Sequence, residues 1–313
     1  MASSDDHALE REFRDLMATA HPVSALTEQD ALRAIQAYPH LLMVGPMFGV
    51  AEWRQRGWRV SALSECTPQG ARDALAHRFR EYAAAGTAGR AEFLSVARML
   101  DRERHDELTV AGRRFRIIRV EQVIRMSADA PEPPRPTDPD PRHPGRGEDA
   151  QPPDEFLATA DDPPGFAAAE LMCQLRAELP SEETTPADAR QEALRALTAY
   201  PSLRIMAPVF TVAEQIEGGW RSATMPCDTP QRARETLAVY FGQIVPAIED
   251  PSEAEGPEYA SAAQRLTHER VDDLTVAGRR FRIVRIEMIA RLGVDGPEPP
   301  RRSDFDPEPP IEA

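Results

Sequence analysis

The chain has 313 residues, enough for two domains of ordinary size that each bury a core of their own. Its formal net charge of −15 would repel a phosphate backbone, which argues against general nucleic-acid binding. The longest apolar run, near residues 41–51, is too short to span a bilayer, and the first residues show no signal-peptide pattern, so we expect a cytoplasmic protein that does not contact membranes.

Cysteine and lysine usage add two constraints. The three cysteines form no C-x-x-C pair, and their odd number suits reduced thiols better than a disulfide framework. All 37 basic residues are Arg, and neither Lys nor Asn occurs, which indicates the coding bias of a G+C-rich genome. The abundance of Arg is therefore weak evidence of function.

A long internal repeat organises the sequence. Residues 31–83 match residues 193–245 at an offset of 162, and residues 97–141 match residues 263–307 at an offset of 166. A repeat of this length predicts a tandem duplication.

Three segments follow from the repeat. We expect a first repeat with its Pro-rich tail over residues 1–141, and a second repeat with its tail over residues 165–313. Residues 142–164 are rich in Pro, Asp and Glu and poor in large apolar residues, so they are expected to form a flexible acidic linker.

In chain order, each copy is expected to begin with a helix. Thr27 and Thr185 are each followed three residues later by Asp, a capping pattern that predicts the start of this helix. Pro39 and Pro201 end it.

Strands and further helices follow. Apolar runs at residues 41–48 and 203–210, each followed by Gly-Trp-Arg, predict two strands joined by a short connection. Thr67 and Thr229, each followed by Pro, predict the start of a second helix with apolar positions three to four residues apart. Another amphipathic stretch then leads to the segment in which the copies are most alike.

That segment is predicted to be a β-hairpin. Gly112 and Gly278 supply the positive φ that a tight turn needs. In the returning strand the apolar side chains change parity between Ile117 and Ile118, and the second copy repeats the change. We expect a β-bulge near Ile117–Ile118; the alternative is a strand that passes from one buried face to another.

Each copy ends in a Pro-rich tail. The segment Pro131-Glu-Pro-Pro-Arg returns as Pro297-Glu-Pro-Pro-Arg, and Ser/Thr-Asp-x-Asp follows in both tails. Such a tail is expected to be extended. We expect it to cover the edge of its own sheet; the alternative is docking in an aromatic groove of a partner.

The hairpin sequence Val-Ala-Gly-Arg-Arg-Phe-Arg-Ile-x-Arg-x-Glu, together with the tail pattern, resembles a family of uncharacterised actinobacterial proteins, streptomycete in the main. This family is catalogued only as a domain of unknown function. The resemblance spans both copies and implies no activity, cofactor or catalytic residue.

Catalytic and metal-binding motifs are missing from the sequence. None of the seven histidines and none of the cysteines occupies the same position in both copies, and no metalloprotease, nucleophile-elbow, Walker or dinucleotide pattern is present. We therefore expect no catalytic, cofactor-binding or metal site that is repeated in both copies. A single site in one copy, or one shared at the interface between copies, is the alternative.

The polar residues that both copies keep are mostly carboxylates and guanidinium groups, for which ion pairing is the expected purpose. Glu52 and Glu214 are expected to serve as helix caps or salt-bridge partners, with a catalytic carboxylate as the alternative. The other kept pairs are Arg59/Arg221, Thr67/Thr229, Gln69/Gln231, Arg72/Arg234, Glu103/Glu269, Arg104/Arg270 and Asp106/Asp272.

Arginines of the long strand are the candidate contacts for an anion or a partner: Arg114, Arg116, Arg119, Arg280, Arg282 and Arg285. We expect them along a solvent-exposed face, paired with acidic residues such as Asp106, Glu107 and Glu121. The alternative is a cationic groove across the interface, suited to an acidic peptide or a phosphorylated ligand.

Two further pairs of residues have a functional and a structural interpretation. Trp58 and Trp220 are expected to be buried core residues rather than stacking platforms. Asp138-x-Asp140 and its counterpart at residues 304–306 are expected to be solvated turn carboxylates rather than calcium ligands.

The sequence thus predicts an α+β fold, a tandem internal duplication in which each copy packs helices on one face of a small, mainly antiparallel sheet. The copies are expected to form a pseudo-dimeric monomer, with a homo-oligomer as the alternative. We predict a non-enzymatic binding or protein-interaction protein without cofactor, whose partner is an unknown protein or a small anionic ligand. The alternative is an enzyme with a single site at the interface of the repeats.

Overall fold

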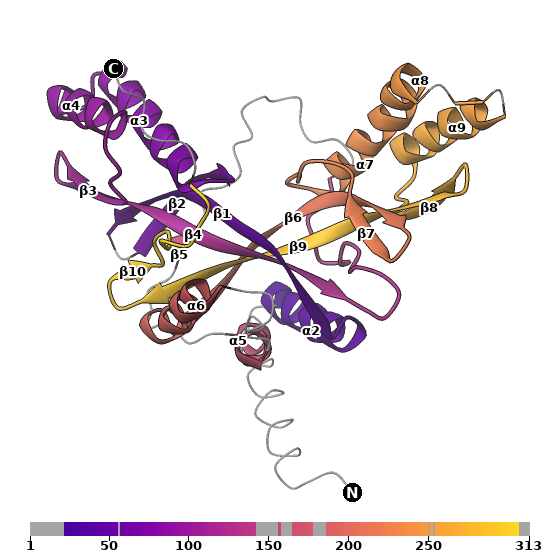
Figure 1. Ribbon diagram of the computed structural model, residues 1–313, viewed down its shortest axis with the longest axis horizontal. Helices are drawn as coiled ribbons and strands as arrows, with labels where there is room; N and C mark the ends of the chain where they lie inside the picture. Colours follow the sequence, from indigo (N-terminus) through magenta and orange to yellow (C-terminus); the bar gives the residue numbers. More distant parts are fainter. Residues whose placement is uncertain are drawn as a thin grey trace, which may run out of the picture.

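A computed structural model describes residues 22–55, 57–141, 156–157, 165–177, 186–249, 251–252 and 254–306 of the chain. It shows one long, curled antiparallel sheet with helices packed against it (Figure 1). Among the described residues, no helix is long and apolar enough to cross a membrane.

The strands are distributed over two halves, residues 22–141 and 165–306. The first half contains β1 His40–Arg54, β2 Gly57–Glu65, β3 Glu107–Val110 and β4 Arg113–Met126. The second half contains β6 Ser202–Ile216, β7 Gly219–Ser222, β8 Asp273–Val276, β9 Arg279–Gly293 and β10 Gly296–Pro297. The sheet order is β5-β2-β1-β4-β9-β6-β7, with β3 beside β4, and β8 and β10 beside β9.

Strand β5, Phe156–Leu157, belongs to the segment predicted to be a linker and pairs with β2 at the edge of the sheet. The other residues of that segment lie outside the described part of the chain.

Helices α2 Pro22–Ala37, α3 Pro68–Ala84 and α4 Arg90–Leu100 belong to the first half. The second half contains α5 Phe166–Ala177, α6 Ala187–Ala199, α7 Pro230–Val239, the π-helical turn η1 Tyr240–Ile244, α8 Val245–Ile248 and α9 Glu255–His268. Three helices of the first half have counterparts in the second half, which also contains α5, η1 and α8. In Figure 1, α3 with α4 and α7 with α9 rise on one side of the sheet, while α2, α5 and α6 lie on the other side of its centre.

The two halves meet where β4 and β9 pair. Gln122 lies directly opposite Met288, and these residues are 166 positions apart, the offset that relates the matching segments. On either side of this pair, Glu121 faces Ile289 and Val123 faces Glu287. The strands therefore cross at equivalent positions of the two halves.

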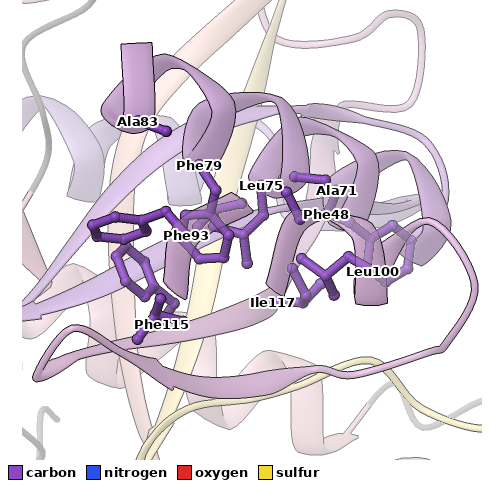
Figure 2. Close-up of a cluster of buried hydrophobic side chains, with 13 residues drawn as sticks. Phe48, Ala71, Leu75, Phe79, Ala83, Phe93, Leu100, Phe115 and Ile117 are labelled. Carbon is purple, nitrogen blue, oxygen red and sulfur yellow. The ribbon is translucent and has the colours of Figure 1, made fainter. Parts of the chain in front are cut away.

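Apolar side chains fill the space between the sheet and each helical pair. In the first half, Phe79 of α3 stacks edge-on against Phe115 of β4, with ring centroids 4.9 Å apart, and Phe93 of α4 closes the cluster (Figure 2). In the second half, Phe241 and Phe281 make the equivalent contact at 5.0 Å. Each half thus has a core of its own.

The predicted bulge near Ile117–Ile118 is wrong. These residues pair in continuous register with Val50 and Gly49 of β1, and the register shift lies in β1, between Met43 and Gly45. Ile117 packs in the cluster under α3 and α4, while Ile118 packs on the other face with Trp58. The parity change reflects a strand buried on both faces, which was the alternative.

The hairpin turn between β3 and β4 has the predicted glycine. Ala111 and Gly112 have φ values of +49° and +72°, as a type I′ turn requires at both central positions. The backbone amide of Ala111 donates to the Glu92 carboxylate at 2.7 Å, a bond from α4 that helps to hold this non-glycine residue in the left-handed region.

The opening helix starts earlier than predicted. Helix α2 begins at Pro22, so Thr27 lies inside the helix and is not its N-cap. Pro at the first helical position provides the start instead. Thr185 lies outside the described residues. Asp30, which the capping pattern placed at N3, is buried and accepts hydrogen bonds from the backbone and the hydroxyl of Thr137.

The caps of the second helix are confirmed. Thr67 Oγ1 accepts from the Gly70 amide at 3.1 Å, and Thr229 Oγ1 accepts from the Arg232 amide at 3.2 Å. Each bond satisfies an amide of the first helical turn that has no partner within the helix.

We expect Thr67→Ala to lower the free energy of unfolding by about 1 kcal/mol, since it removes this cap. Chemical denaturation measures the change. Thr198→Ala, on the exposed surface of α6, is the control, with an expected change within about 0.5 kcal/mol. Equal effects of the two substitutions would show that the cap contributes nothing.

Candidate functional site

Of the six candidate arginines, the two at the hairpin end of each long strand share one carboxylate. Arg114 Nε lies 2.6 Å from one oxygen of Glu107, and Arg116 Nη2 lies 2.7 Å from the other. These bonds and charges lower the pKa of Glu107, although partial burial alone would raise it. In the second half, Arg280 and Arg282 both pair with Asp273.

The two tryptophans lie under these arginines. The guanidinium carbons of Arg114 and Arg116 are 5.0 and 5.1 Å from the ring centroid of Trp58, within the range of a cation–π contact. Trp58 is buried, as predicted. Trp220 is only half-buried, contrary to the prediction, because its ring lies at the short outer strand β7.

The strand arginines that lie closer to the centre of the sheet hold the Pro-rich tails. Arg119 Nε is 3.0 Å from Asp304 of the C-terminal tail, and its Nη1 is 2.9 Å from Glu121. Arg116 Nη1 donates to the Pro297 carbonyl at 3.0 Å. The tail that leaves the second half therefore lies on β4 of the first half.

The other tail makes the reciprocal contacts. Arg285 Nε is 3.1 Å from Asp138, and Arg282 Nη1 donates to the Pro131 carbonyl at 2.9 Å. The tail of the first half thus lies on β9 of the second. The prediction that each tail covers the edge of its own sheet holds only for the first tail residues, where Pro297 pairs with β9 and Pro131 with the end of β4. It is wrong for the rest of each tail, because the tail aspartates pair with arginines of the opposite half.

The expected solvent-exposed arginine face is also wrong: three of the six residues are buried, and Arg114, Arg280 and Arg282 are half-buried. Arg116 is 5% exposed, Arg119 9% and Arg285 5%. Acidic neighbours are present as predicted at Glu107 and Glu121, whereas Asp106 pairs with Arg72 instead. These arginines are buried because the tails cover the strand surface that was expected to face solvent.

The end of the C-terminal tail meets the start of α3. One carboxylate oxygen of Asp306 accepts from the Gln69 backbone amide at 3.0 Å, and the other accepts from Arg72 Nη1 at 2.8 Å. Arg72 is in turn oriented by Asp106, 2.8 Å from its Nε. A carboxylate at a helix N-terminus is favoured by the free amides and the helix dipole.

The first tail ends in the same way on α7. Asp140 lies 2.6 Å from Arg234 Nη2, and Asp272 lies 2.5 Å from Nη1 of the same guanidinium group. Arg234 is fully buried. The prediction that the tail aspartates are solvated turn carboxylates is therefore wrong; they are ion-paired, because the tails dock rather than extend into solvent.

A buried network of charges lies under each tail. Under the C-terminal tail, Glu121 accepts from Arg291 at 3.0 Å and from Arg301 at 3.2 Å, and Arg301 also lies 2.6 Å from Glu298. The network contains three arginines and three carboxylates: Arg119, Arg291, Arg301, Glu121, Glu298 and Asp304. Its charges cancel, which is the condition for keeping ions in a protein interior.

The second network, under the other tail, contains the counterparts of these six residues, each 166 positions away in the sequence. Arg135 bonds to Glu132 at 2.5 Å and to Glu287 at 2.7 Å, and Arg125 lies 3.4 Å from Glu287. Burial raises the pKa of Glu132, although the bond from Arg135 acts in the opposite direction. The pKa of Glu287 is lowered, because the positive charges of Arg285, Arg135 and Arg125 outweigh the effect of its burial.

The pKa of Glu121 predicts acid sensitivity. Burial alone would raise it, but the charges of Arg291, Arg119 and Arg301 outweigh burial and lower it from 4.5 to about 2. A carboxylate whose pKa is lowered by folding stabilises the folded state fully when the pH is above its pKa in the unfolded chain. This contribution is lost as the pH falls through its pKa in the folded protein.

We therefore expect the stability difference between the wild type and Glu121→Gln to be full above pH 4.5 and to shrink between pH 4.5 and about 2. Urea denaturation of both proteins at a series of pH values measures it. If the stability difference between the two proteins stayed constant down to about pH 2.5, Glu121 would not be the group whose negative charge stabilises the fold.

Glu52 and Glu214 lie away from the tails, near the hairpins. Glu52 lies 2.6 Å from Arg113 and 2.9 Å from Arg54. Glu214 is 2.7 Å from both Arg279 and Arg221, and the bond from Arg279 lowers its pKa. Each carboxylate is thus placed between two guanidinium groups.

The thiols and other candidate metal ligands are scattered. Cys66 and Cys173 are exposed and Cys227 is half-buried, where burial raises the pKa of its thiol. Within the described ranges, no group of three or more His, Cys, Asp or Glu side chains is placed to hold a metal ion.

The tail carboxylates and Asp30 belong to the candidate sites, whereas the sequence pattern placed them in solvated turns and in a helix cap. Glu192 stands 162 residues after Asp30 and accepts from the Ser303 amide, as Asp30 accepts from Thr137. The signal was present, because both tails carry Glu, Arg, Asp and Asp at the same spacing while the long strands carry a matching series of arginines.

The fold and the sites define a mixed helix and antiparallel-sheet protein that holds its own extended acidic tails in charged sites. The sequence model of a family of unknown function, DUF5954, matches residues 21–307, and the chain belongs to this family. No curated protein and no solved structure matches the chain.

Proposed function

We propose that this chain is a non-enzymatic, cytoplasmic protein that acts by binding another protein. The observation that supports this most is the use made of the charged side chains common to both halves. Arg72, Arg119 and their counterparts Arg234 and Arg285 all hold an extended segment of polypeptide. Among the described residues, the ion pairs of these arginines are with carboxylates, which are not poised for proton transfer beside a guanidinium group.

A small anionic ligand has less support. Each of the six candidate arginines of the long strands already faces a carboxylate of the chain. An inorganic anion would have to displace a carboxylate of the same chain, which is held at the arginine by its covalent tether. A peptide can replace several of these carboxylates at once, so its contacts add up.

We also propose that the chain is a tandem duplication that forms a fused pseudo-dimer. Three facts support this: the pairing of Gln122 with Met288 at the repeat offset, the reciprocal tails and the equivalent cores. The lack of Lys and Asn supports an actinobacterial origin with a G+C-rich genome.

Affinity capture tests the binding function. The full chain, immobilised in its native state, is exposed to a lysate of its host, and heat-denatured chain serves as the control. We expect one protein to be retained in near-stoichiometric amount. If no protein is retained above the control, and the purified chain converts a component of a metabolite mixture, the enzyme alternative replaces this proposal.

A further inference from the structure

The two tails are different segments that bind to two sites through the same contacts. In the C-terminal tail, Glu298 and Arg301 pair with each other, Asp304 pairs with Arg119, and Asp306 pairs with Arg72. In the other tail, the corresponding pairs are Glu132–Arg135, Asp138–Arg285 and Asp140–Arg234. Each site thus holds Glu-x-x-Arg-x-x-Asp-x-Asp.

Between these charged positions the two tails share Pro-Pro after the Glu and differ at the other three positions. Phe305 replaces Pro139 and is 75% exposed, and Arg302 replaces Pro136, also on the surface. Both sites therefore hold the same charged residues at the same spacing, while the positions after the Arg accept different side chains.

In the site of the first half, the two arginines also have partners outside the tail. Asp106 orients Arg72, and Glu121 orients Arg119, so both guanidinium groups have a second partner that does not belong to the tail. The Gln69 amide is fixed by the start of α3. A preorganised site of this kind loses little entropy when a ligand binds.

Only part of the C-terminal tail is built into the sheet. Glu298 is buried, its amide donates to the Arg291 carbonyl, and its carbonyl accepts from the Arg119 amide. Residues 299–306 are held mainly by side-chain ion pairs and hydrogen bonds, with the exposed residues between them. These are the residues that a competing segment would replace.

We propose that this site, formed by Gln69, Arg72, Arg119 and Glu121, binds an extended segment of a partner protein with the pattern Arg-x-x-Asp-x-Asp, in exchange for residues 299–306. Charge complementarity selects the ligand: Glu121 and Glu298 face its arginine, Arg119 faces its first aspartate, and Arg72 with the start of α3 faces its second. The inference rests on the proposed binding function and names the chemistry of the partner.

A synthetic peptide tests the exchange. The probe has the sequence of residues 299–307, Pro-Pro-Arg-Arg-Ser-Asp-Phe-Asp-Pro, with a fluorescent label, and its anisotropy is followed on titration with the full chain at about 0.1 M salt. The double variant Asp304→Asn/Asp306→Asn weakens the chain's own tail. We expect this variant to bind the probe at least about tenfold more tightly than the wild type, whose tethered tail has a high effective concentration.

Matched controls locate the binding. Adding Arg72→Gln to the double variant is expected to abolish binding, as is replacing both aspartates of the probe by Asn. The single variant Asp306→Asn provides the same comparison if the double variant does not fold, as judged by circular dichroism.

No anisotropy change with a folded variant up to about 1 mM peptide would overturn the proposal and make the tail a fixed structural element. A wild-type chain that dimerises on concentration, and loses the dimer on Asp304→Asn/Asp306→Asn, would assign the site to a second copy and would also overturn it. Capture of a partner protein together with a failed peptide titration would leave the binding function intact and refute only this inference.

Discussion

Glu121→Gln is expected to lower the free energy of unfolding by about 3–5 kcal/mol. The carboxylate accepts hydrogen bonds from Arg119, Arg291 and Arg301, and its exposed fraction is 6%. A neutral amide would leave a net positive charge in the interior of the network, and the desolvation of these arginines would no longer be offset. Urea denaturation near neutral pH measures the effect.

Glu287→Gln is the matched variant in the other network, since Glu287 pairs with Arg285 and Arg135 and is equally buried. We expect a loss of similar size. Glu269→Gln is the control, because its pair with Arg265 is half-exposed on both sides and contributes about 1 kcal/mol or less. A loss below about 1 kcal/mol for Glu121→Gln would show that the network does not stabilise the fold.

Gly296→Ala is expected to destabilise the protein by more than about 2 kcal/mol. Gly296 has a φ of +117°, which L-residues rarely adopt, and a Cβ there would overlap the Trp58 indole, with Cε2 only 2.6 Å away. Trp58 comes from β2 of the first half and Gly296 from β10 at the start of the C-terminal tail, so the substitution disturbs a contact between the two halves.

Gly45→Ala separates the strain from the overlap. Gly45 has a φ of +123°, close to that of Gly296, but nothing lies within 4 Å of the position of its Cβ. We therefore expect a smaller loss, from backbone strain alone. Tryptophan fluorescence provides a second measurement, which should change for Gly296→Ala and not for Gly45→Ala. Equal losses and unchanged fluorescence in both variants would contradict the close packing on Trp58.

Local signals in the sequence were reliable where the physical cause was also local. The Thr67 cap and the hairpin turn at Gly112 were predicted correctly, because a hydroxyl before Pro and a residue with positive φ act within one helical turn or one hairpin. The predicted Thr27 cap is wrong, since the equally local signal of Pro22 starts the helix five residues before Thr27.

The parity change at Ile117–Ile118 shows a different limit. Apolar side chains on both parities are compatible with a bulge or with a strand covered on both faces, and the sequence pattern is the same in the two cases. Only the packing of Ile118 against Trp58, from a distant strand, distinguishes them.

The sequence by itself determined which segments occur twice, the types of most elements and the set of arginines in the candidate sites. Periodicity, turn chemistry and residue identity are properties of short segments. The tertiary structure alone decided which carboxylate meets which arginine. Arg72 and Asp306 are 234 residues apart, and Arg119 and Asp304 are 185 apart. An ion pair depends on distance in space, which sequence spacing does not constrain across a curled sheet, so the exchange of tails between the halves and the burial of their charges appear only in the fold.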